Sequence, residues 1–343
     1  MKTYNLALNK TSGLSLVELM IAMAVSGILM LGISQIFSIN SRSYKVQDES
    51  ARMQESGRYA FNTLMTDIRR AGYFGGNATV GSVSGSEGIA PPARNCLTTD
   101  TSWGRMIERA FYGLNDALSH NDKDGLAVNY TACIPAADYL RGDILVMRYA
   151  KGAAITSFDS NRLYIRNSLF EGRLFKGIDQ AVTASNAVSE NPQSVHELAA
   201  HAYYVGPSGR NCRFKASDNS DIPIPALFRE KLSSAGVPEK EEVSSGIEYI
   251  QFQYGIDNSG DGHVHSYYNA HQLSNDEGIT PNWTQIQTVR LWVLVRADCP
   301  TAGYTNSKTY TMGDIDVPTS SGGYKPNDSF KRQLYSTVVA VRN

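Results

Sequence analysis

The chain has 343 residues, enough for one large hydrophobic core or two modest ones. Hydrophobic residues make up 42% of it and charged residues 19%, a balance that argues against a disordered protein. The net charge is −1 and no long basic run occurs, so the electrostatic footprint of a nucleic-acid-binding protein is missing. The 19 tyrosines and 29 glycines favour a body rich in strands and turns.

The N-terminal segment joins a short basic leader to a long apolar run. The leader, residues 1–13, contains Lys2 and Lys10 and no acidic residue, whereas residues 14–39 contain one charge, Glu18. A helix rises about 1.5 Å per residue, so this run is long enough to cross a hydrocarbon core about 30 Å thick. Positive charge beside the first apolar span keeps that end in the cytoplasm, so the rest of the chain is predicted to lie beyond the membrane.

The single carboxylate in this run, Glu18, requires a partner inside a membrane. Glu18 in a bilayer costs about 2.5–3.5 kcal/mol on insertion scales, so it needs a cation or a proton. If the chain is cut after Gly13, the new amino terminus at Leu14 is a cation, and a neighbour's terminus that meets Glu18 would favour one axial register. The alternative is a Glu18 close enough to the interface to reach water. A conventional signal peptide is the weaker interpretation, because small residues precede the apolar run instead of following it.

Gly13 followed by LSLVELMIA resembles the class III leader of type IV pilins and type II secretion pseudopilins. In that superfamily a prepilin peptidase cuts after the glycine and methylates the new amino terminus. The resemblance implies cleavage between Gly13 and Leu14, an N-methylated Leu14 and an assembly role for Glu18, although Leu14 stands where phenylalanine is usual. It also implies a single-pass protein of the inner membrane with a periplasmic C-terminal domain, incorporated into a surface filament.

A single helix is predicted to continue past the membrane, because no proline occurs in the first 90 residues. It should run from near Ser15 to about Ala71 and end at Gly72. Residues 40–72 form its amphipathic half, with Asp67 on a polar face. The apolar stripe that would cover a globular body consists of Val46, Met53, Ala60, Leu64, Ile68 and Ala71.

Residues 73–343 are predicted to form a β-rich globular domain. Apolar residues alternate with polar ones in IEYIQFQYGI and VRLWVLVRA, the pattern of half-buried strands. Further strands are expected at 142–150, 161–167, 200–206 and 332–343, and short helices at 106–118 and 225–233. A long helix packed on one antiparallel sheet is an α+β fold.

The closing region extends the resemblance. The segment IEYIQFQYGID, the glycine-rich acidic loop after it, VRLWVLVRA and the terminal STVVAVRN are similar to the PilW family of minor pilins. This similarity implies a pilin-like fold and a structural role: a minor pilin that helps initiate type IV pilus assembly and forms the tip complex. The implied partners are the prepilin peptidase, other minor pilins, the major pilin and the inner-membrane assembly machinery. A J-like pseudopilin of type II secretion and a pilus-displayed adhesin stay open as alternatives.

Four cysteines occur singly, and none forms a CxxC pair that would suggest zinc or redox chemistry. An even number behind a membrane-targeting segment favours disulfides in an oxidising compartment. Local pairs need less chain closure, so Cys96–Cys133 and Cys212–Cys299 are the predicted bonds. Buried free thiols are the alternative.

The stretch DNSGDG offers oxygen ligands at alternate positions, Asp257, Ser259 and Asp261, as at the start of a calcium loop. The full loop fails, because Tyr268 stands where a bidentate glutamate belongs. A structural calcium ion is one hypothesis and a plain hairpin loop is the other. Residues 121–125 form a similar acidic turn, and no other cofactor is expected.

No catalytic signature is present. His263 and His265 share a face if the segment is extended and could bind a transition metal, but no third ligand is evident and surface histidines explain them. The motifs HExxH, GxSxG, GxxxxGK[ST] and GxGxxG are absent, and no nucleophile is paired with a base. The sequence therefore predicts a protein that is not an enzyme.

Overall fold

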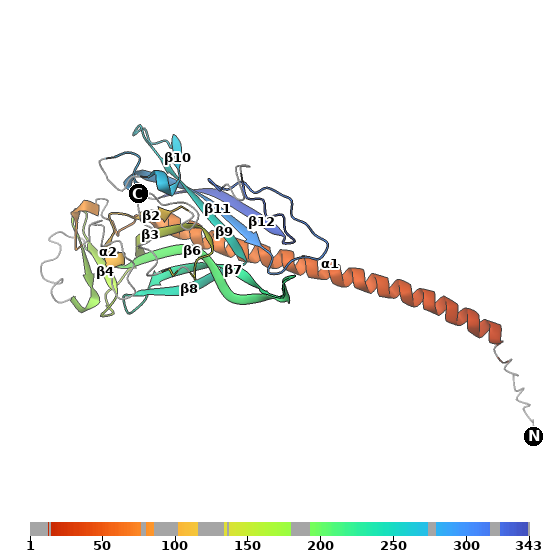
Figure 1. Ribbon diagram of the computed structural model, residues 1–343. Helices are drawn as coiled ribbons and strands as arrows, with labels where there is room; N and C mark the ends of the chain where they lie inside the picture. Colours follow the sequence, from red (N-terminus) through yellow and green to blue (C-terminus); the bar gives the residue numbers. More distant parts are fainter. Residues whose placement is uncertain are drawn as a thin grey trace, which may run out of the picture. The chain divides into compact units, whose positions relative to one another are not determined.

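The computed structural model describes residues 13, 15–76, 80–85, 102–115, 134–135, 137–179, 193–273, 279–315 and 323–341. The chain divides into two compact units, Met1–Ala51 and Arg52–Asn343. Helix α1, Leu16–Arg70, passes from the first unit into the second, so the boundary lies inside a helix and not in a loop. Figure 1 shows α1 and the strands of the second unit.

Helix α1 has 55 residues without interruption, as the absence of proline predicted. After it the chain turns at Gly72, whose φ of 84° is a left-handed value that favours glycine. The predicted stripe is buried in the second unit at Met53, Ala60, Leu64, Ile68 and Ala71. Gly57 belongs to the same buried face, where a Cβ atom would lie 2.5 Å from the Tyr335 ring, so the helix and the sheet approach closely there.

The remaining elements are mostly strands. In chain order they are η1 (Val80–Ser82), β1 (Val83–Ser84), α2 (Ser102–Arg105), β2 (Phe111–Leu114), β3 (Arg141–Ala154), β4 (Leu163–Asn167), β5 (Gly172–Lys176), η3 (Gly177–Asp179), β6 (Ser194–Lys215), β7 (Asp221–Leu232), β8 (Pro238–Ser245), β9 (Ile247–Ile256), β10 (Ser266–Tyr268), η4 (Ala270–Gln272), η5 (Trp283–Gln285), β11 (Ile286–Arg296) and β12 (Arg332–Ala340). The strands expected from alternation are therefore confirmed.

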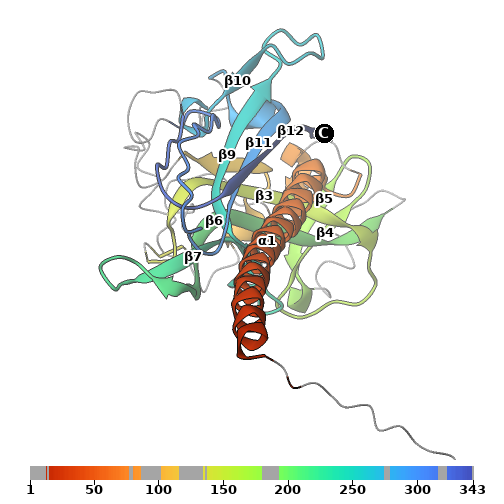
Figure 2. The same ribbon diagram turned by 90° about the vertical axis from the view of Figure 1, so that its right-hand side faces the viewer.

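The strands form two sheets, so the α+β class is right but the single predicted sheet is wrong. In the described part of the chain, the larger sheet has the order β1-β5-β4-β6-β3-β2, with β7 on β6 and β8 on β7. The smaller sheet has the order β10-β9-β11-β12, and Figure 2 shows β9, β11 and β12 side by side. Among the described strands, all pairs are antiparallel except β1 with β5. Two sheets and a helix cover one another's apolar faces, which one sheet of all these strands could not do.

Both predicted short helices are wrong. Residues 106–118 contain strand β2, preceded by the single turn α2, and residues 225–232 belong to β7. Strand β7 lies between β6 and β8, and its run Ala226, Leu227 and Phe228 is buried. A strand covered on both faces reads as a continuous apolar run, which periodicity cannot distinguish from a short helix.

Strand β9 is buried more completely than its alternation suggests. Its polar residue Gln251 is only 1% exposed. The segment after β11 covers the outer face of the smaller sheet, where Tyr310, Met312 and Ile315 pack with Tyr249 of β9. The alternation in the sequence predicted that this face is exposed to solvent. It did not reveal that the segment after β11 covers the face.

Asp67 is the exception on α1, because it was predicted to lie on a polar face and is buried. Its carboxylate accepts a hydrogen bond from the Tyr149 hydroxyl of β3 at 2.8 Å, and from Tyr203 and His201 Nδ1 of β6 at 2.6 Å each. Burial alone would raise the pKa of Asp67, but the hydrogen bonds and charge of His201 and the two tyrosine hydroxyls hold this pKa below its ordinary value. One carboxylate thus fastens the helix to two strands of the larger sheet.

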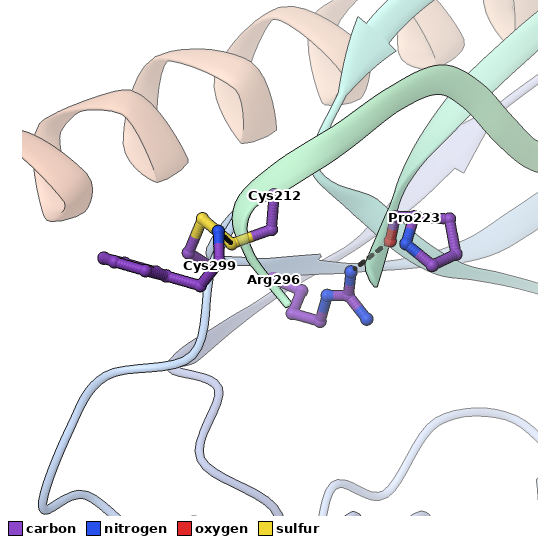
Figure 3. The surroundings of a disulfide bond; sticks show 5 residues. Cys212, Pro223, Arg296 and Cys299 are labelled. Atoms are coloured by element: carbon purple, nitrogen blue, oxygen red, sulfur yellow. Dashed lines mark hydrogen bonds between the residues drawn. A yellow bond between two sulfur atoms is a disulfide. The ribbon is translucent and has the colours of Figure 1, made fainter. Parts of the chain in front are cut away.

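A disulfide links the larger sheet to the segment that connects β11 and β12 of the smaller sheet. Cys212 in β6 is bonded to Cys299, which follows β11, with the Cα atoms 5.3 Å apart (Figure 3). Beside it, Arg296 Nη2 donates a hydrogen bond to the carbonyl of Pro223 in β7 at 2.8 Å. This is one of the two predicted pairings. The other, Cys96–Cys133, lies outside the described residues.

Candidate assembly site

The first turn of α1 explains how a carboxylate is held at the start of an apolar helix. Glu18 Oε2 accepts a hydrogen bond from the backbone N–H of Ser15, the residue before the helix, at 3.0 Å. This is the glutamate half of a capping box, in which the side chain at the third helical position reaches back to the capping residue. A negative charge at this end also interacts favourably with the helix dipole. Glu18 is therefore satisfied within its own chain at this point, yet exposed.

The rest of the first unit presents apolar side chains to its surroundings. The most apolar window of 18 residues in α1 has a mean hydropathy of 2.3, and none of it is buried. Two of its serines are satisfied within the helix, because the hydroxyl of Ser26 donates to the Ala22 carbonyl at 2.7 Å and that of Ser38 to the Ser34 carbonyl at 2.9 Å. An exposed helix with internally satisfied polar groups is what a hydrocarbon environment requires.

Two glycines interrupt the apolar surface. Apart from the adjoining residues and backbone of α1 itself, no described atom lies within 4 Å of the Cβ position of Gly27 or Gly32. Small residues let two helix backbones approach closely in a membrane. The exposed half of α1 thus carries Glu18 at its first turn and two glycines, at positions where a second helix could approach its backbone closely.

The predicted cleavage residues are only partly described. Gly13 is placed, with no atom within 4 Å of its Cβ position, whereas Leu14 lies outside the described residues. The acidic turn at 121–125 also lies outside them. The Ser15 cap was missed at the sequence level, although the spacing S-x-x-E at the start of an apolar run signals it.

The acidic loop after β9 is closed by its first aspartate. Asp257 Oδ1 accepts the backbone N–H groups of Ser259 (3.0 Å) and Gly260 (2.7 Å), and Oδ2 accepts that of Gly262 (2.7 Å). Desolvation would raise the pKa of Asp257, but these N–H donors and the Ser259 hydroxyl lower it well below its ordinary value. The loop therefore keeps a carboxylate charged at any physiological pH.

Among the described residues, this loop brings together one group that has the donor types of a metal site. Ligand atoms of Asp257, Asp261 and His265 lie within 4.8 Å of one another. His265 Nε2 lies 3.4 Å from Asp261 Oδ2, so the imidazole and this carboxylate already contact each other. Ser259, expected as a ligand, donates its hydroxyl to Asp257 instead. His263 is not part of this group, and its backbone N–H donates to Asp261.

The geometry defines a class of protein: a subunit with an exposed apolar N-terminal helix, a carboxylate at its first turn and a β-rich body on its second half, as in pilins. The prokaryotic N-terminal methylation motif matches residues 8–34, and the family model of Type IV Pilus-assembly protein W, PilW, matches residues 202–343. The C-terminal part of the chain is therefore similar to the PilW family, and the two matches support the role of a minor pilin of a type IV pilus. The resemblance seen in the leader and the C-terminal strands is thereby confirmed.

No curated protein matches the chain. Among solved structures, a type IV-like pilin from Thermus thermophilus is similar at 16% identity, over 60% of this chain and 80% of that one. The TM-score is 0.26, too low to define a shared fold. The two matches indicate a structural protein with membrane anchoring, incorporation into a pilus and contact with other pilins.

Proposed function

We propose that this minor pilin acts at the start of pilus assembly, where it joins other minor pilins in a tip complex and primes addition of the major pilin. The prepilin peptidase cuts between Gly13 and Leu14 and methylates the amino group of Leu14. The apolar half of α1 holds the protein in the inner membrane, with the body in the periplasm, until the assembly machinery draws it into the filament. No catalytic activity forms part of this role.

The observation that carries the proposal is the single carboxylate at the first turn of an exposed apolar helix. Its contact with the Ser15 N–H and the helix dipole recovers about 0.3–1 kcal/mol. Burying Glu18 in the bilayer costs about 2.5–3.5 kcal/mol. About 1.5–3 kcal/mol of the insertion cost of Glu18 therefore remains. The cationic amine of Leu14 in a neighbouring subunit offsets this remainder by pairing with the carboxylate. A subunit in the wrong axial register would not gain it.

The width of the body supports a position at the end of a filament. The larger sheet places six strands side by side, which at about 4.8 Å per step spans about 24 Å. Packed helices lie only about 8–10 Å apart. If every helix of a close-packed bundle carried a globular domain of this width, neighbouring domains would clash. A subunit at the tip of the filament has neighbours on fewer sides, so its domain has more room.

Glu18→Ala tests the proposed pairing, with Glu55→Ala, an exposed glutamate further along α1, as the matched control. Cells that produce each variant as the only copy would be separated into membranes and sheared pili, and the protein quantified in both. Glu18→Ala should reach the membrane at wild-type level and fall at least tenfold in pili, whereas Glu55→Ala should behave as the wild type. Equal incorporation of Glu18→Ala would refute the role of the carboxylate.

The position in the filament has its own test. Immunogold labelling of the body on isolated pili should place the label at filament ends, and deletion of the gene should reduce the number of surface pili. Label spread evenly along the filaments, or an unchanged pilus number, would contradict a tip or initiating role while leaving the pairing of Glu18 untouched.

A further inference from the structure

Strand β12 ends the smaller sheet, and one of its two edges has no neighbouring strand in the described part of the chain (Figure 2). Its other edge pairs with β11 through all nine residues of the strand, without a bulge. The ladder continues past both ends. The Ala297 N–H donates to the Lys331 carbonyl at 2.9 Å, and the Val341 N–H donates to the Gln287 carbonyl at 2.8 Å. Strand β12 is therefore held against β11 in one register.

These two bonds show which backbone groups of β12 point away from β11. In an antiparallel ladder, residues that exchange hydrogen bonds with the neighbouring strand alternate with residues whose N–H and C=O groups point to the opposite side. Lys331 and Val341 bond to the β11 side, so the odd-numbered residues between them do as well. The even-numbered residues point outward, and we call the backbone of four of them the free edge: Leu334, Ser336, Val338 and Ala340. No described residue forms a hydrogen bond with the outward groups of the free edge.

The other strands that end a sheet are protected against pairing in ways that β12 is not. Among the described strands, β1 has two residues, β10 three and β2 four, so each is too short to hold another strand firmly. Strand β8 has eight residues, but it begins with a proline and continues with four charged residues: Pro238, Glu239, Lys240, Glu241 and Glu242. Strand β12 has nine residues, and residues 333–341 contain neither a charge nor a proline. A long edge without such features associates with other chains unless something covers it.

The side chains of β12 divide between a packed face and an open one. Tyr335 lies on the face that packs on α1, where its ring centroid is 6.0 Å from that of Phe61. On the opposite face Ser336 and Ala340 are exposed, and Val338 is 52% exposed. The free edge thus belongs to a strand that packs on α1, the helix through which the subunit is proposed to assemble.

We propose that the free edge pairs with a β-strand of a neighbouring pilin in the tip complex, so that the smaller sheet continues across the subunit boundary. This rests on the proposed function, in which the chain joins other minor pilins. Alternating N–H and C=O groups are complementary to another extended backbone, and main-chain hydrogen bonds supply the affinity. The partner strand should be uncharged and carry a β-branched or small apolar residue opposite Val338, because such cross-strand pairs stabilise sheets.

A second copy of this chain is the less suitable occupant of the free edge. Two copies that pair antiparallel through the same strand are related by a two-fold axis and form a closed dimer. Subunits that follow one another along a filament are related by rotation and translation, so they meet through different surfaces. A strand from a different part of a neighbouring pilin satisfies this condition.

Two substitutions at Val338 separate backbone pairing from side-chain contact. Val338→Pro removes an outward N–H of the free edge and leaves the ladder to β11, since proline is tolerated on edge strands where its missing N–H faces outward. Val338→Ala is the matched control, because it shortens the side chain and keeps the N–H. In cells that produce each variant as the only copy, both should reach the membrane at wild-type level. Val338→Pro should fall at least fivefold in sheared pili, and Val338→Ala less than twofold.

Wild-type incorporation of Val338→Pro, or an equal loss with Val338→Ala, would overturn the proposal. Failure of the proposed function has a different signature. Normal incorporation of Glu18→Ala, or label spread along the filaments, would refute the proposed function and leave the result at Val338 to be read on its own.

Hydrogen exchange on the wild-type chain gives a readout that needs no substitution, and it decides the matter if near-ultraviolet circular dichroism shows that Val338→Pro does not fold. The full-length chain in detergent is compared alone and after co-purification with the other minor pilins of the same pilus. In the complex the amides of Ser336 and Val338 should exchange at least tenfold more slowly. Those of Thr337 and Val339, which already face β11, should not change.

Absence of this alternation in the complex would overturn strand pairing at the free edge. Protection of the Ser336 and Val338 amides in the chain alone, together with a dimer in light scattering, would assign the free edge to a second copy. That result would also overturn the proposal of a neighbouring pilin.

Discussion

Asp67→Asn isolates the charge that fastens α1 to the larger sheet. The asparagine has the shape of the aspartate, so no cavity forms, but the acceptor for Tyr149, Tyr203 and His201 becomes neutral. The substitution therefore tests the claim that this buried carboxylate anchors the helix.

The expected loss follows from the number and kind of these bonds. A hydrogen bond to a charged acceptor contributes about 1.5–3 kcal/mol, but three that share one carboxylate do not add. The amide keeps one acceptor oxygen, and the tyrosine hydroxyls can turn to accept from its NH₂ group. We expect the free energy of unfolding to fall by about 2–4 kcal/mol, somewhat less than the about 3–5 kcal/mol lost when a buried ion pair is broken outright.

The pH dependence gives a second, sharper readout. The folded-state pKa of Asp67 is lower than its ordinary value of 3.8. The contribution of the carboxylate is therefore fully present above about pH 4 and is lost as the pH falls through the folded-state pKa. The difference in unfolding free energy between the wild type and Asp67→Asn should therefore shrink as the pH falls below about 4.

Equilibrium denaturation of the full chain in detergent, followed by near-ultraviolet circular dichroism, measures both effects. The control is Glu55→Gln on the same helix, where an exposed site should change stability by no more than about 0.5 kcal/mol. A loss below about 1 kcal/mol for Asp67→Asn at pH 7, or a difference that persists unchanged at pH 2, would refute the anchoring role.

Three further expectations concern the leader, the disulfide and the acidic loop. Gly13→Ala should leave a full-length precursor on a gel when the prepilin peptidase is present, and normal processing would disprove cleavage at this glycine. Replacing both Cys212 and Cys299 by serine opens a loop of 87 residues, and the chain-entropy relation predicts that the free energy of unfolding falls by about 4–5 kcal/mol. A decrease below about 1 kcal/mol in urea denaturation would contradict a stabilising role of this disulfide. Asp261→Ala should lower the melting temperature only with calcium supplied, if the acidic loop binds it, and an equal shift in chelator would argue for a purely structural loop.

The sequence alone predicted the parts of this protein that depend on local order. A run of apolar residues without proline is a helix whatever surrounds it, and the stripe from Met53 to Ala71 repeats at helical spacing. The strands β9 and β11 follow from alternation within ten or so residues. The leader and Glu18 are linked by a fixed short spacing, which is why the family could be identified before any contact was known.

The failures of prediction also have a common cause. Residues 225–232 look helical until β6 and β8 lie on both sides of them, and Asp67 looks like a surface residue until three donors from β3 and β6 reach it. Burial on two faces removes the alternation that marks a strand, and a buried charge is tolerated only where partners from elsewhere satisfy it.

The amino-acid order by itself thus determined the membrane helix, its capped acid and most of the strands, since each depends on neighbours a few positions away. Only the tertiary structure decided that the strands divide into two sheets and that Asp67 is an anchor. The contacts of Asp67 join residues separated by 82 to 136 positions, and no periodicity along the chain encodes them.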